Sequence, residues 1–236
     1  MRHVKSNHII TLLLVTTLAM QLYILRQTKV ASGQPFAVPS IDDSVSAAPA
    51  NSIIDISALA VHGSNSARVV LVEFSDFECP FCDRHAKSVG KQLDDEFVAT
   101  GKIKHGFANY PQNKHASAAL LAVAGMCASN QNKFWKMHEQ IFAHAPRSEF
   151  DVSSVATNMG LDLRQFQECL KGDREVLRRI EQQRQMAQKL QLMGTPGFAI
   201  GVSDTENRVK VQMLIRGSQP LHVFQEVLKK VIENLS

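Results

Sequence analysis

The sequence predicts an α/β sandwich with a block of helices inserted into it. A β-rich apolar run at residues 68–74 is followed directly by a helical pattern. After a second strand-like run at 103–109, helical patterns follow one another up to residue 193, and two more strand-like runs precede a final amphipathic helix. This order of elements is typical of an α/β domain with a helical insertion, which we place at about residues 112–190.

Strands are expected where apolar and β-branched side chains cluster or alternate with polar ones. The run at residues 68–74 is apolar enough to be buried, and the alternation at 103–109 indicates a second strand. Two further strands, joined by a turn, are expected at 198–200 and 209–215.

Helices are expected where apolar residues recur every three or four positions. Gly160 divides one of these regions into two short helices, and Asp173 is the type of residue that caps a helix N-terminus. The predicted helical regions are 80–100, 114–145, 151–170, 173–193 and 220–235.

The N-terminal residues predict a leader and a linker. We interpret residues 1–8 as a cytoplasmic stub and residues 9–25, which carry no charge, as a signal anchor or a cleaved signal peptide. The apolar run continues past a weak cleavage pattern at 17–19, which favours the anchor, and its terminal position after a basic stub disfavours a buried core helix. Residues 26–50, rich in Ser, Ala, Pro and Gln, predict a flexible linker before a domain at 51–236.

The charge pattern gives no support to nucleic-acid binding. The net charge of +4 arises from residues 1–41, which contain four basic residues and no acidic one. The rest of the chain is neutral overall, without a basic patch or a run of like charge. The flanking charges around residues 9–25 are balanced, so we place the C-terminal domain outside the cytoplasm because its cysteine chemistry requires an oxidising compartment.

The four cysteines divide into a close pair and a distant pair. Cys79 and Cys82 form a Cys-x-x-Cys motif, whereas Cys127 and Cys169 lie far apart. This spacing fits one redox-active pair and one structural disulfide. Two free buried thiols are the alternative for the distant pair.

The close pair lies where a strand ends and a helix begins. Pro80 suits the first helical turn because its missing N–H would have no partner there, which places Cys79 at the helix N-terminus. Free N–H groups and the positive end of the helix dipole favour a thiolate at this position. The pKa of Cys79 should therefore fall below the usual value of about 8.5. Cys82 lies within the same turn and can attack a mixed disulfide formed on Cys79.

A zinc site is the alternative for this motif, because His85 extends it to Cys-x-x-Cys-x-x-His. Zinc needs about four ligands at compatible spacing, and there is no second close pair, so we expect neither a metal nor a cofactor. A second motif, Gly-Thr-Pro-Gly at residues 194–197, could by itself be an ordinary turn. Beside the cysteine motif it predicts a cis bond before Pro196 and a backbone at Thr195 that can pair with an extended substrate.

Four segments together resemble the DsbA-like thioredoxin family. They occur in the order found in its membrane-anchored or secreted bacterial members, and the resemblance runs from about residue 51 to the C-terminus. It implies a thioredoxin fold with an inserted helical domain. The segments are EFSDFECPFC, CASNQNKFWKMHEQIF, GLDLRQFQECL and GTPGFAIG.

The resemblance also implies residue roles. Cys79 is the expected nucleophile, Cys82 the resolving cysteine, and Pro196 the cis-proline with Thr195 before it. Glu73 stands where the family commonly keeps a buried acid, and a carboxylate there could relay a proton for Cys82. The alternative for Glu73 is a carboxylate at a strand end that reaches solvent.

The resemblance further implies a disulfide between Cys127 and Cys169, which members of the family often bridge. Two features depart from the strongest oxidants of the family. Phe81 stands where they have His, and it can offer the thiolate neither a hydrogen bond nor a positive charge. Thr195 before the cis-proline is closer to isomerase-type relatives. We therefore expect a less depressed pKa of Cys79 and an oxidising power below the limit of about −120 mV.

These features favour a periplasmic oxidase that donates the Cys79–Cys82 disulfide to unfolded or partly folded exported proteins. We expect a membrane redox partner to re-oxidise it, and an N-terminal segment that either anchors it to the inner membrane or is cleaved after secretion. The alternatives are an isomerase or reductase in the same compartment, oligomerised through residues 26–65, and a non-catalytic envelope interaction protein.

Overall fold

The structure is a computed structural model that describes residue 21 and residues 44–144, 151–204 and 207–235. The chain divides into two compact units, Met1–Pro39 and Ser40–Ser236, and the second is the one whose elements are described. The predicted stub, all of the signal segment except Gln21, and the linker up to residue 43 lie outside the described residues. Across the described ranges, no helix combines the length and the apolar character that crossing a membrane requires.

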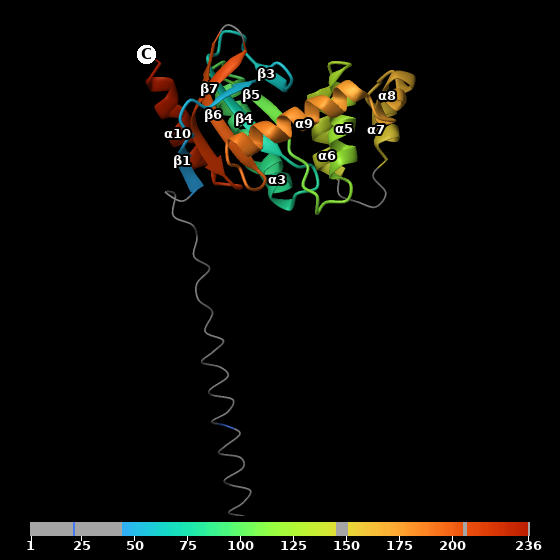
Figure 1. Cartoon of the computed structure of the whole chain (residues 1–236), viewed down its shortest axis with the longest axis horizontal. Coiled ribbons are helices and arrows are strands. Elements are labelled where there is room, and N and C mark those ends of the chain that lie inside the picture. The colour runs from blue at the N-terminus through green and yellow to red at the C-terminus, as the bar shows by residue number, and fades with distance from the viewer. Residues whose placement is uncertain (1–20, 22–43, 145–150, 205–206, 236) are drawn as a thin grey trace, which may run out of the picture. The chain divides into compact units, whose positions relative to one another are not determined.

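The second unit is built around a seven-stranded mixed sheet (Figure 1). The strand order is β1-β7-β6-β4-β5-β3, and β2 also pairs with β7. β4 and β5 run parallel, whereas the other pairs are antiparallel. The strands are β1 (Val45–Ala47), β2 (Ile53–Asp55), β3 (Ala60–Gly63), β4 (Val69–Ser75), β5 (Ile103–Asn109), β6 (Gly197–Ser203) and β7 (Arg208–Arg216).

Different helices cover the two faces of this sheet. Successive side chains of β4 point to opposite faces, as the pleat of a strand requires. Leu71 lies in the core beneath α10 (Leu221–Glu233), and Val72 lies in the core beneath the C-terminal part of α9 (Arg174–Lys189). Because it is covered on both sides, β4 is buried at every residue. The predicted α/β sandwich is therefore confirmed.

A continuous helical run follows β4, as the pattern at 80–100 predicts. Two stretches of it widen to π-helical hydrogen bonding. The run consists of α3 (Pro80–His85), η1 (Ala86–Gly90), α4 (Lys91–Leu93) and η2 (Asp94–Val98).

Helices α5 to α9 form the predicted insertion between β5 and β6; α5 to α8 lie to one side of the sheet, and α9 runs back across it (Figure 1). Asp151, Asp162 and Asp173 accept N–H bonds at the starts of α7, α8 and α9, so the expected cap at Asp173 is confirmed. The insertion has its own apolar core, which also includes Cys79 and Cys82. Besides α9, its helices are α5 (Ala118–Ser129), α6 (Phe134–His144), α7 (Val152–Asn158) and α8 (Leu163–Leu170).

Three short strands near the start of this unit were not predicted. β1 lies inside the predicted linker at 26–50, and its Val45 pairs with Ile215 of β7, so the C-terminal boundary of the linker is wrong. β2 pairs with β7, and β3 pairs with β5. Strands of three or four residues are too short to show a periodicity. They form because longer strands offer unpaired backbone groups at the sheet edges.

Candidate active site

Cys79 sits at the junction between β4 and α3. It is the N-cap residue of α3, and Pro80 occupies the first helical turn. The N–H of Cys79 donates to the carbonyl of Asp76 (3.0 Å), and the carbonyl of Cys79 accepts from the N–H of Asp83 (3.0 Å). This junction aims the free N–H groups of the first turn toward the cysteine side chain.

The sulfur of Cys79 is held where its thiolate is stabilised. Cys79 is 5% exposed, and its Sγ lies 3.4 Å from the carbonyl oxygen of Thr195. A hydrogen bond from Cys82 is the largest influence on the pKa of Cys79; burial opposes it, and hydrogen bonds from Thr195 and from the backbone of Cys82 and Phe81 reinforce it. The net effect lowers the pKa of Cys79 from 9.0 to about 5, so the thiolate dominates at neutral pH.

Cys82 has the opposite setting. It is fully buried, and burial raises its pKa far above the ordinary value of a thiol. The hydrogen bond to Cys79 and the negative charge of Glu73 raise it further. The reduced pair is therefore one thiolate, on Cys79, and one thiol, on Cys82, which keeps the proton.

The loop before β6 lies against the cysteine pair. Its Thr195–Pro196 peptide bond is cis, and the Thr195 carbonyl faces the Cys79 sulfur. The carbonyl of Pro196 accepts from the N–H of Gly217 (2.8 Å), which fastens the loop to the end of β7. The structure thus brings the sequence-predicted residues Cys79, Cys82, Thr195 and Pro196 together.

Glu73 is buried rather than solvent-exposed, with 1% of its surface accessible. Its Oε2 lies 3.8 Å from Nε2 of His85 and 3.6 Å from Nε2 of His105. Burial by itself would raise the pKa of Glu73, but interactions with His85 and His105 outweigh burial and lower this pKa to about 2. Glu73 is therefore a buried carboxylate beneath Cys82.

The positive charge that compensates Glu73 resides on His105. Burial works against protonation of His105, but hydrogen bonds to Asp94 and Glu73 prevail and raise the pKa to about 9. Burial lowers the pKa of His85, and the negative charge of Glu73 partly opposes this effect. The ring of His85 packs against Phe198 and Phe224, with centroids 4.6 and 5.4 Å away, so it is a core residue at the back of α3.

Asp76 is a site residue that the sequence reasoning missed. It is 2% exposed, and its carboxylate accepts from the N–H of Glu78 (2.8 Å), the N–H of Gln112 (2.7 Å) and Nδ1 of His115 (2.8 Å). Asp76 therefore fastens the loop that carries Cys79 to the segment after β5. The available signal was an acidic residue placed between a buried strand and the cysteine motif.

The distant cysteine pair is joined. Cys127 near the end of α5 and Cys169 near the end of α8 form a disulfide with a Cα–Cα distance of 5.8 Å. This bond closes a loop of 42 residues inside the helical insertion.

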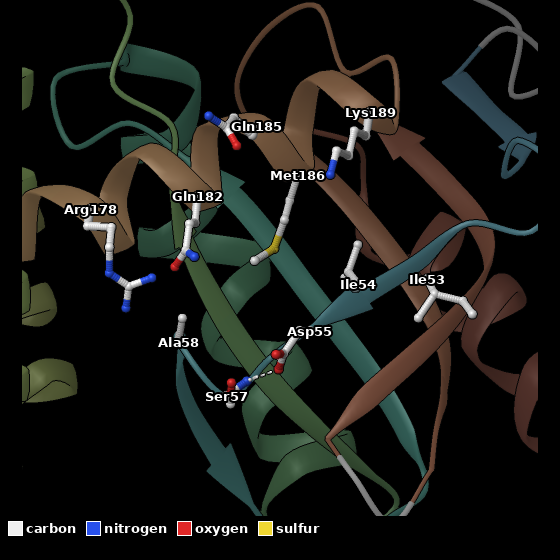
Figure 2. A pocket seen from close by; sticks show the side chains of 10 residues that line it. All are labelled: Ile53, Ile54, Asp55, Ser57, Ala58, Arg178, Gln182, Gln185, Met186 and Lys189. Atoms are coloured by element: carbon white, nitrogen blue, oxygen red, sulfur yellow. Dashed lines mark hydrogen bonds between the residues drawn. The ribbon is translucent and has the colours of Figure 1, made fainter. Parts of the chain in front are cut away.

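A separate hollow of ≈ 450 Å³ lies between β2 and α9 (Figure 2). Ile54 and Met186 form part of its floor, and Arg178 and Lys189 stand at its rim (Figure 2). None of the residues predicted for the active site lines it. The hollow is therefore separate from the cysteine site at the start of α3.

Comparison with known proteins agrees with this geometry. A family model described as thioredoxin matches residues 58–215, more than half of the chain. The curated relatives include Na⁺/H⁺ antiporter NhaA 3 of Salinispora tropica, 32% identical over 142 residues, a match that covers 59% of this chain and 21% of the antiporter. The chain thus spans about a fifth of the length of that relative. Another relative is the probable disulfide bond formation protein D of Bacillus anthracis, 27% identical over 147 residues, covering 58% of this chain and 67% of that protein.

Solved structures share the fold at low sequence identity. BdbD from Bacillus subtilis, in its oxidised form, superposes with a TM-score of 0.63 at 21% identity, covering 75% of this chain and 95% of that one. α-DsbA1 from Wolbachia pipientis also gives 0.63, at 20% identity, covering 75% and 92%. The chain therefore belongs to the thioredoxin family, and its fold is that of the DsbA-like thiol–disulfide oxidoreductases within it.

Proposed function

We propose that this chain is an extracytoplasmic thiol–disulfide oxidoreductase that introduces disulfides into exported proteins through Cys79 and Cys82. One observation carries the proposal. The sulfur of Cys79 lies at the N-terminus of α3, where hydrogen bonds from Cys82, from Thr195 and from the backbone of Cys82 and Phe81 lower its pKa to about 5. A thiolate stabilised in this way is a good leaving group, which favours transfer of the disulfide to a substrate.

The reaction consists of two exchanges. A substrate thiolate attacks Sγ of Cys79 in the oxidised pair, the Cys79–Cys82 bond breaks, and Cys82 leaves with the electron pair and takes up a proton. A second substrate thiolate then attacks the substrate sulfur of the mixed disulfide and releases Cys79 as a thiolate. The substrate is oxidised by two electrons, and the enzyme is reduced by two. A membrane redox partner would restore the Cys79–Cys82 bond.

Glu73 is proposed to relay the proton of Cys82. Its carboxylate is buried and its negative charge acts on Cys82, so it can pass a proton between that sulfur and the histidines behind it. Glu73→Gln should slow the steps in which Cys82 gains or loses a proton by about tenfold or more. Rapid-quench kinetics of mixed-disulfide resolution measure this, with the exposed Glu226→Gln as control. Equal rates in Glu73→Gln and the parent chain would remove the role.

The surroundings of Cys79 suit an unfolded substrate. The backbone of Thr195 can pair with an extended chain, as in strand addition. Phe81 between the two cysteines is 52% exposed, and Met193 just before the loop is 90% exposed. Large apolar side chains exposed beside a reactive group are suited to binding the apolar segments of unfolded proteins.

Two further observations support the compartment and the substrates. The Cys127–Cys169 disulfide is of the kind that persists in oxidising compartments, which supports an extracytoplasmic location. The Bacillus anthracis relative is named a probable disulfide bond formation protein, and we extend that activity to this chain as part of the proposal.

The isomerase alternative requires an oligomerisation module, which residues 26–65 would have to supply. In the described part of that region, β1, β2 and β3 pair with β7 and β5 of the same chain. These strands complete the sheet of the oxidoreductase unit, which favours the oxidase.

The test combines an activity assay with a measurement of the equilibrium redox potential. Oxidised protein should accelerate reactivation of reduced, unfolded ribonuclease, and Cys79→Ser should give no acceleration over air. The Cys79–Cys82 potential, measured against glutathione, should lie above about −150 mV for an oxidase and near −270 mV for a reductase. A value near −270 mV, or equal activity of the parent chain and Cys79→Ser, would refute the oxidase assignment.

A further inference from the structure

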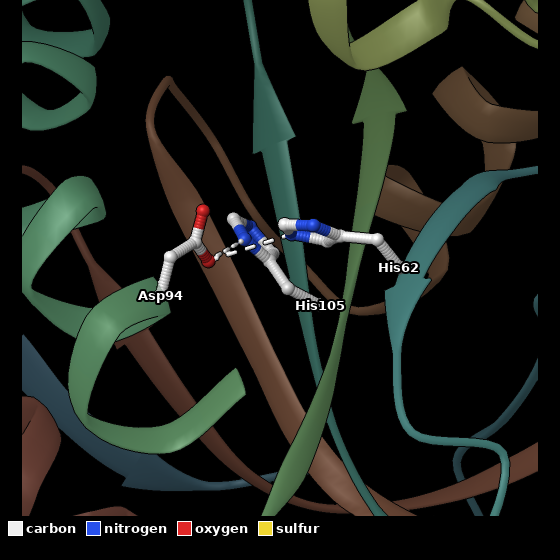
Figure 3. A group of neighbouring side chains, drawn as sticks. All are labelled: His62, Asp94 and His105. Atoms are coloured by element: carbon white, nitrogen blue, oxygen red, sulfur yellow. Dashed lines mark hydrogen bonds and ion pairs between the residues drawn. The ribbon is translucent and has the colours of Figure 1, made fainter. Parts of the chain in front are cut away.

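Three potential metal ligands converge beside the buried carboxylate of Glu73. His62 of β3 and His105 of β5 are directly opposed in an antiparallel pair, so their side chains project to the same face of the sheet. Asp94, at the start of η2, directs its carboxylate toward both imidazole rings (Figure 3). The ring of His62 is held in place by stacking on Trp135, with a centroid distance of 3.9 Å.

The distances between the ligand atoms suit a small tetrahedral ion. Oδ1 of Asp94 lies 3.4 Å from Nε2 of His62 and 3.0 Å from Nδ1 of His105. The three ligand atoms all lie within 4.8 Å of one another. Zinc with ligand bonds of about 2.0–2.1 Å holds its tetrahedral ligand atoms about 3.3 Å apart, so small rotations of the side chains would complete this geometry.

The surrounding cavity has an excess of negative charge. It measures ≈ 420 Å³, and its lining includes the carboxylates of Glu73, Asp94, Asp95 and Glu139. Lys91, the lysine in this lining, already pairs with Asp95 (3.0 Å). A divalent cation would balance part of this negative charge.

The cavity also contains buried polar atoms that lack a hydrogen-bond partner within the described residues. They include Oε1 of Glu73, which is 1% exposed, and Nε2 of His138. Buried polar groups are normally satisfied, and unsatisfied ones indicate a missing water, ion or ligand. These atoms are therefore a second indication, independent of the three ligands, that the cavity holds a polar occupant.

We propose that His62, Asp94 and His105 bind one divalent transition-metal ion, of which Zn²⁺ is the best match. Two imidazoles and one carboxylate form the donor set that such ions prefer, whereas Ca²⁺ and Mg²⁺ require more oxygen ligands. The fourth coordination position faces the cavity, where a water molecule can occupy it. The cysteine pair takes no part in this site.

The ion would be connected to the cysteine site through one side chain. Coordination by Nδ1 of His105 leaves its Nε2 to carry the proton, and Nε2 lies 3.6 Å from Oε2 of Glu73. A carboxylate behind a coordinating imidazole is a common arrangement at metal sites, where it orients the ring. Glu73, the carboxylate beneath Cys82, would have this orienting role.

The experiment uses the full, untagged chain with the Cys79–Cys82 disulfide formed, so that no thiolate competes for the metal. After treatment with a chelator and dialysis, the protein is titrated with Zn²⁺ by calorimetry at neutral pH. We expect one equivalent to bind at this site, with an affinity at least tenfold lower in His62→Ala and in Asp94→Asn. The exposed His222→Ala is the matched control and should bind as the parent chain does.

Two further measurements test the geometry and the metal selectivity of the site. Co²⁺ should give the visible absorption of a four-coordinate ion in the parent chain and lose it in His62→Ala. Ca²⁺ at the same concentration should not displace Zn²⁺. Circular dichroism establishes whether each variant is folded. His62 is only partly buried, so His62→Ala should remain folded and tests the metal site even if Asp94→Asn unfolds. Absence of stoichiometric Zn²⁺ binding, binding unchanged in the folded variants, or displacement by Ca²⁺ would overturn the proposal.

Discussion

The two cysteine pairs of this chain are chemically identical groups in opposite settings. Cys79 lies at the N-terminus of α3, where the helix dipole favours a thiolate, and its partner Cys82 is three residues away. Cys127 and Cys169 each lie in the last turn of a helix, where the negative end of the dipole disfavours a thiolate. Burial does not separate the two pairs, because all four cysteines lie in the same apolar core.

All four sulfurs are buried in the same core, so the comparison shows that position within a helix and the neighbouring loop, rather than burial, decide what a cysteine does. A sulfur at a helix start, beside a loop that can receive a substrate, is suited to exchange. Sulfurs in the last turn of a helix are suited to remain bonded, because the negative end of the helix dipole disfavours the thiolate that exchange requires.

The largest expected effect is on exchange activity, which should depend entirely on Cys79 and very little on the Cys127–Cys169 pair. Cys79→Ser should abolish mixed-disulfide formation with reduced ribonuclease, since it removes the only sulfur with a lowered pKa among the described cysteines. Cys127→Ser combined with Cys169→Ser should retain most of the activity per folded molecule. Non-reducing gels of trapped complexes measure both. Loss of trapping in the double variant while it remains folded would show that the pairs are not independent.

The second effect is on pH dependence. The rate of alkylation of reduced Cys79 by iodoacetamide should increase tenfold per pH unit up to about pH 5 and then level off, because only the thiolate reacts. In urea the midpoint should return to about 9. Cys82→Ala, which removes the strongest hydrogen bond to the Cys79 sulfur, should raise the midpoint. A midpoint near 9 in the folded parent chain would contradict the proposed activation.

The lowered pKa of Cys79 also determines how the stability of the reduced protein depends on pH. The pKa of Cys79 is lower in the folded state than in the unfolded state, so the thiolate stabilises the folded, reduced protein. This contribution is complete above about pH 9, declines as the pH falls, and is absent below about pH 5. The oxidised protein has no such dependence at this pair, so chemical denaturation of both forms across this range measures the difference.

Much of the fold could be predicted from the sequence, because its longer elements have clear patterns. The strand at 68–74 and the helix at 220–235 are strongly apolar or amphipathic, and both agree with the structure to within a residue or two. The strand at 45–47 could not be predicted, because it is stabilised by pairing with β7 rather than by its own pattern. Local sequence contains no information about which edge a short segment will join.

In the candidate site too, some residues could be predicted from the sequence and others could not. The cysteine motif at 79–82 and the loop at 194–197 could be located because each has a recognisable local pattern, although 116 residues separate Cys79 from Thr195. The roles of Asp76 and His105 could not be derived from the sequence, because they depend on partners far away in the chain. Burial and cross-strand pairing create those partnerships, and a single sequence does not reveal them.

A third effect concerns the structural pair. Replacing Cys127 and Cys169 together by Ser should lower the free energy of unfolding by about 4 kcal/mol, since the disulfide closes a 42-residue loop in the unfolded chain. Urea denaturation at neutral pH, with the Cys79–Cys82 pair oxidised in both proteins, measures the loss. A change below about 1 kcal/mol would mean that packing of α5 against α8 already holds the insertion together.

The smallest effect concerns how the reactive loop is held. No disulfide fastens it; instead, the Asp76 carboxylate accepts three hydrogen bonds, from Glu78, Gln112 and His115. Asp76→Asn replaces one accepting oxygen by a donor, so at least one buried bond should be lost, at a cost of about 1–3 kcal/mol.

Asp151→Asn is the matched control, because Asp151 caps an exposed helix start where Asn serves equally well. Paired urea denaturation of the two variants isolates the effect at Asp76. The alkylation midpoint of Cys79 should change little in Asp76→Asn, because Asp76 holds the backbone of the loop and does not contact the sulfur through its carboxylate. Equal stability of the two variants would show that the loop is held by packing around Phe77 and the cysteines, and that the reactive pair, like the structural one, depends on its core.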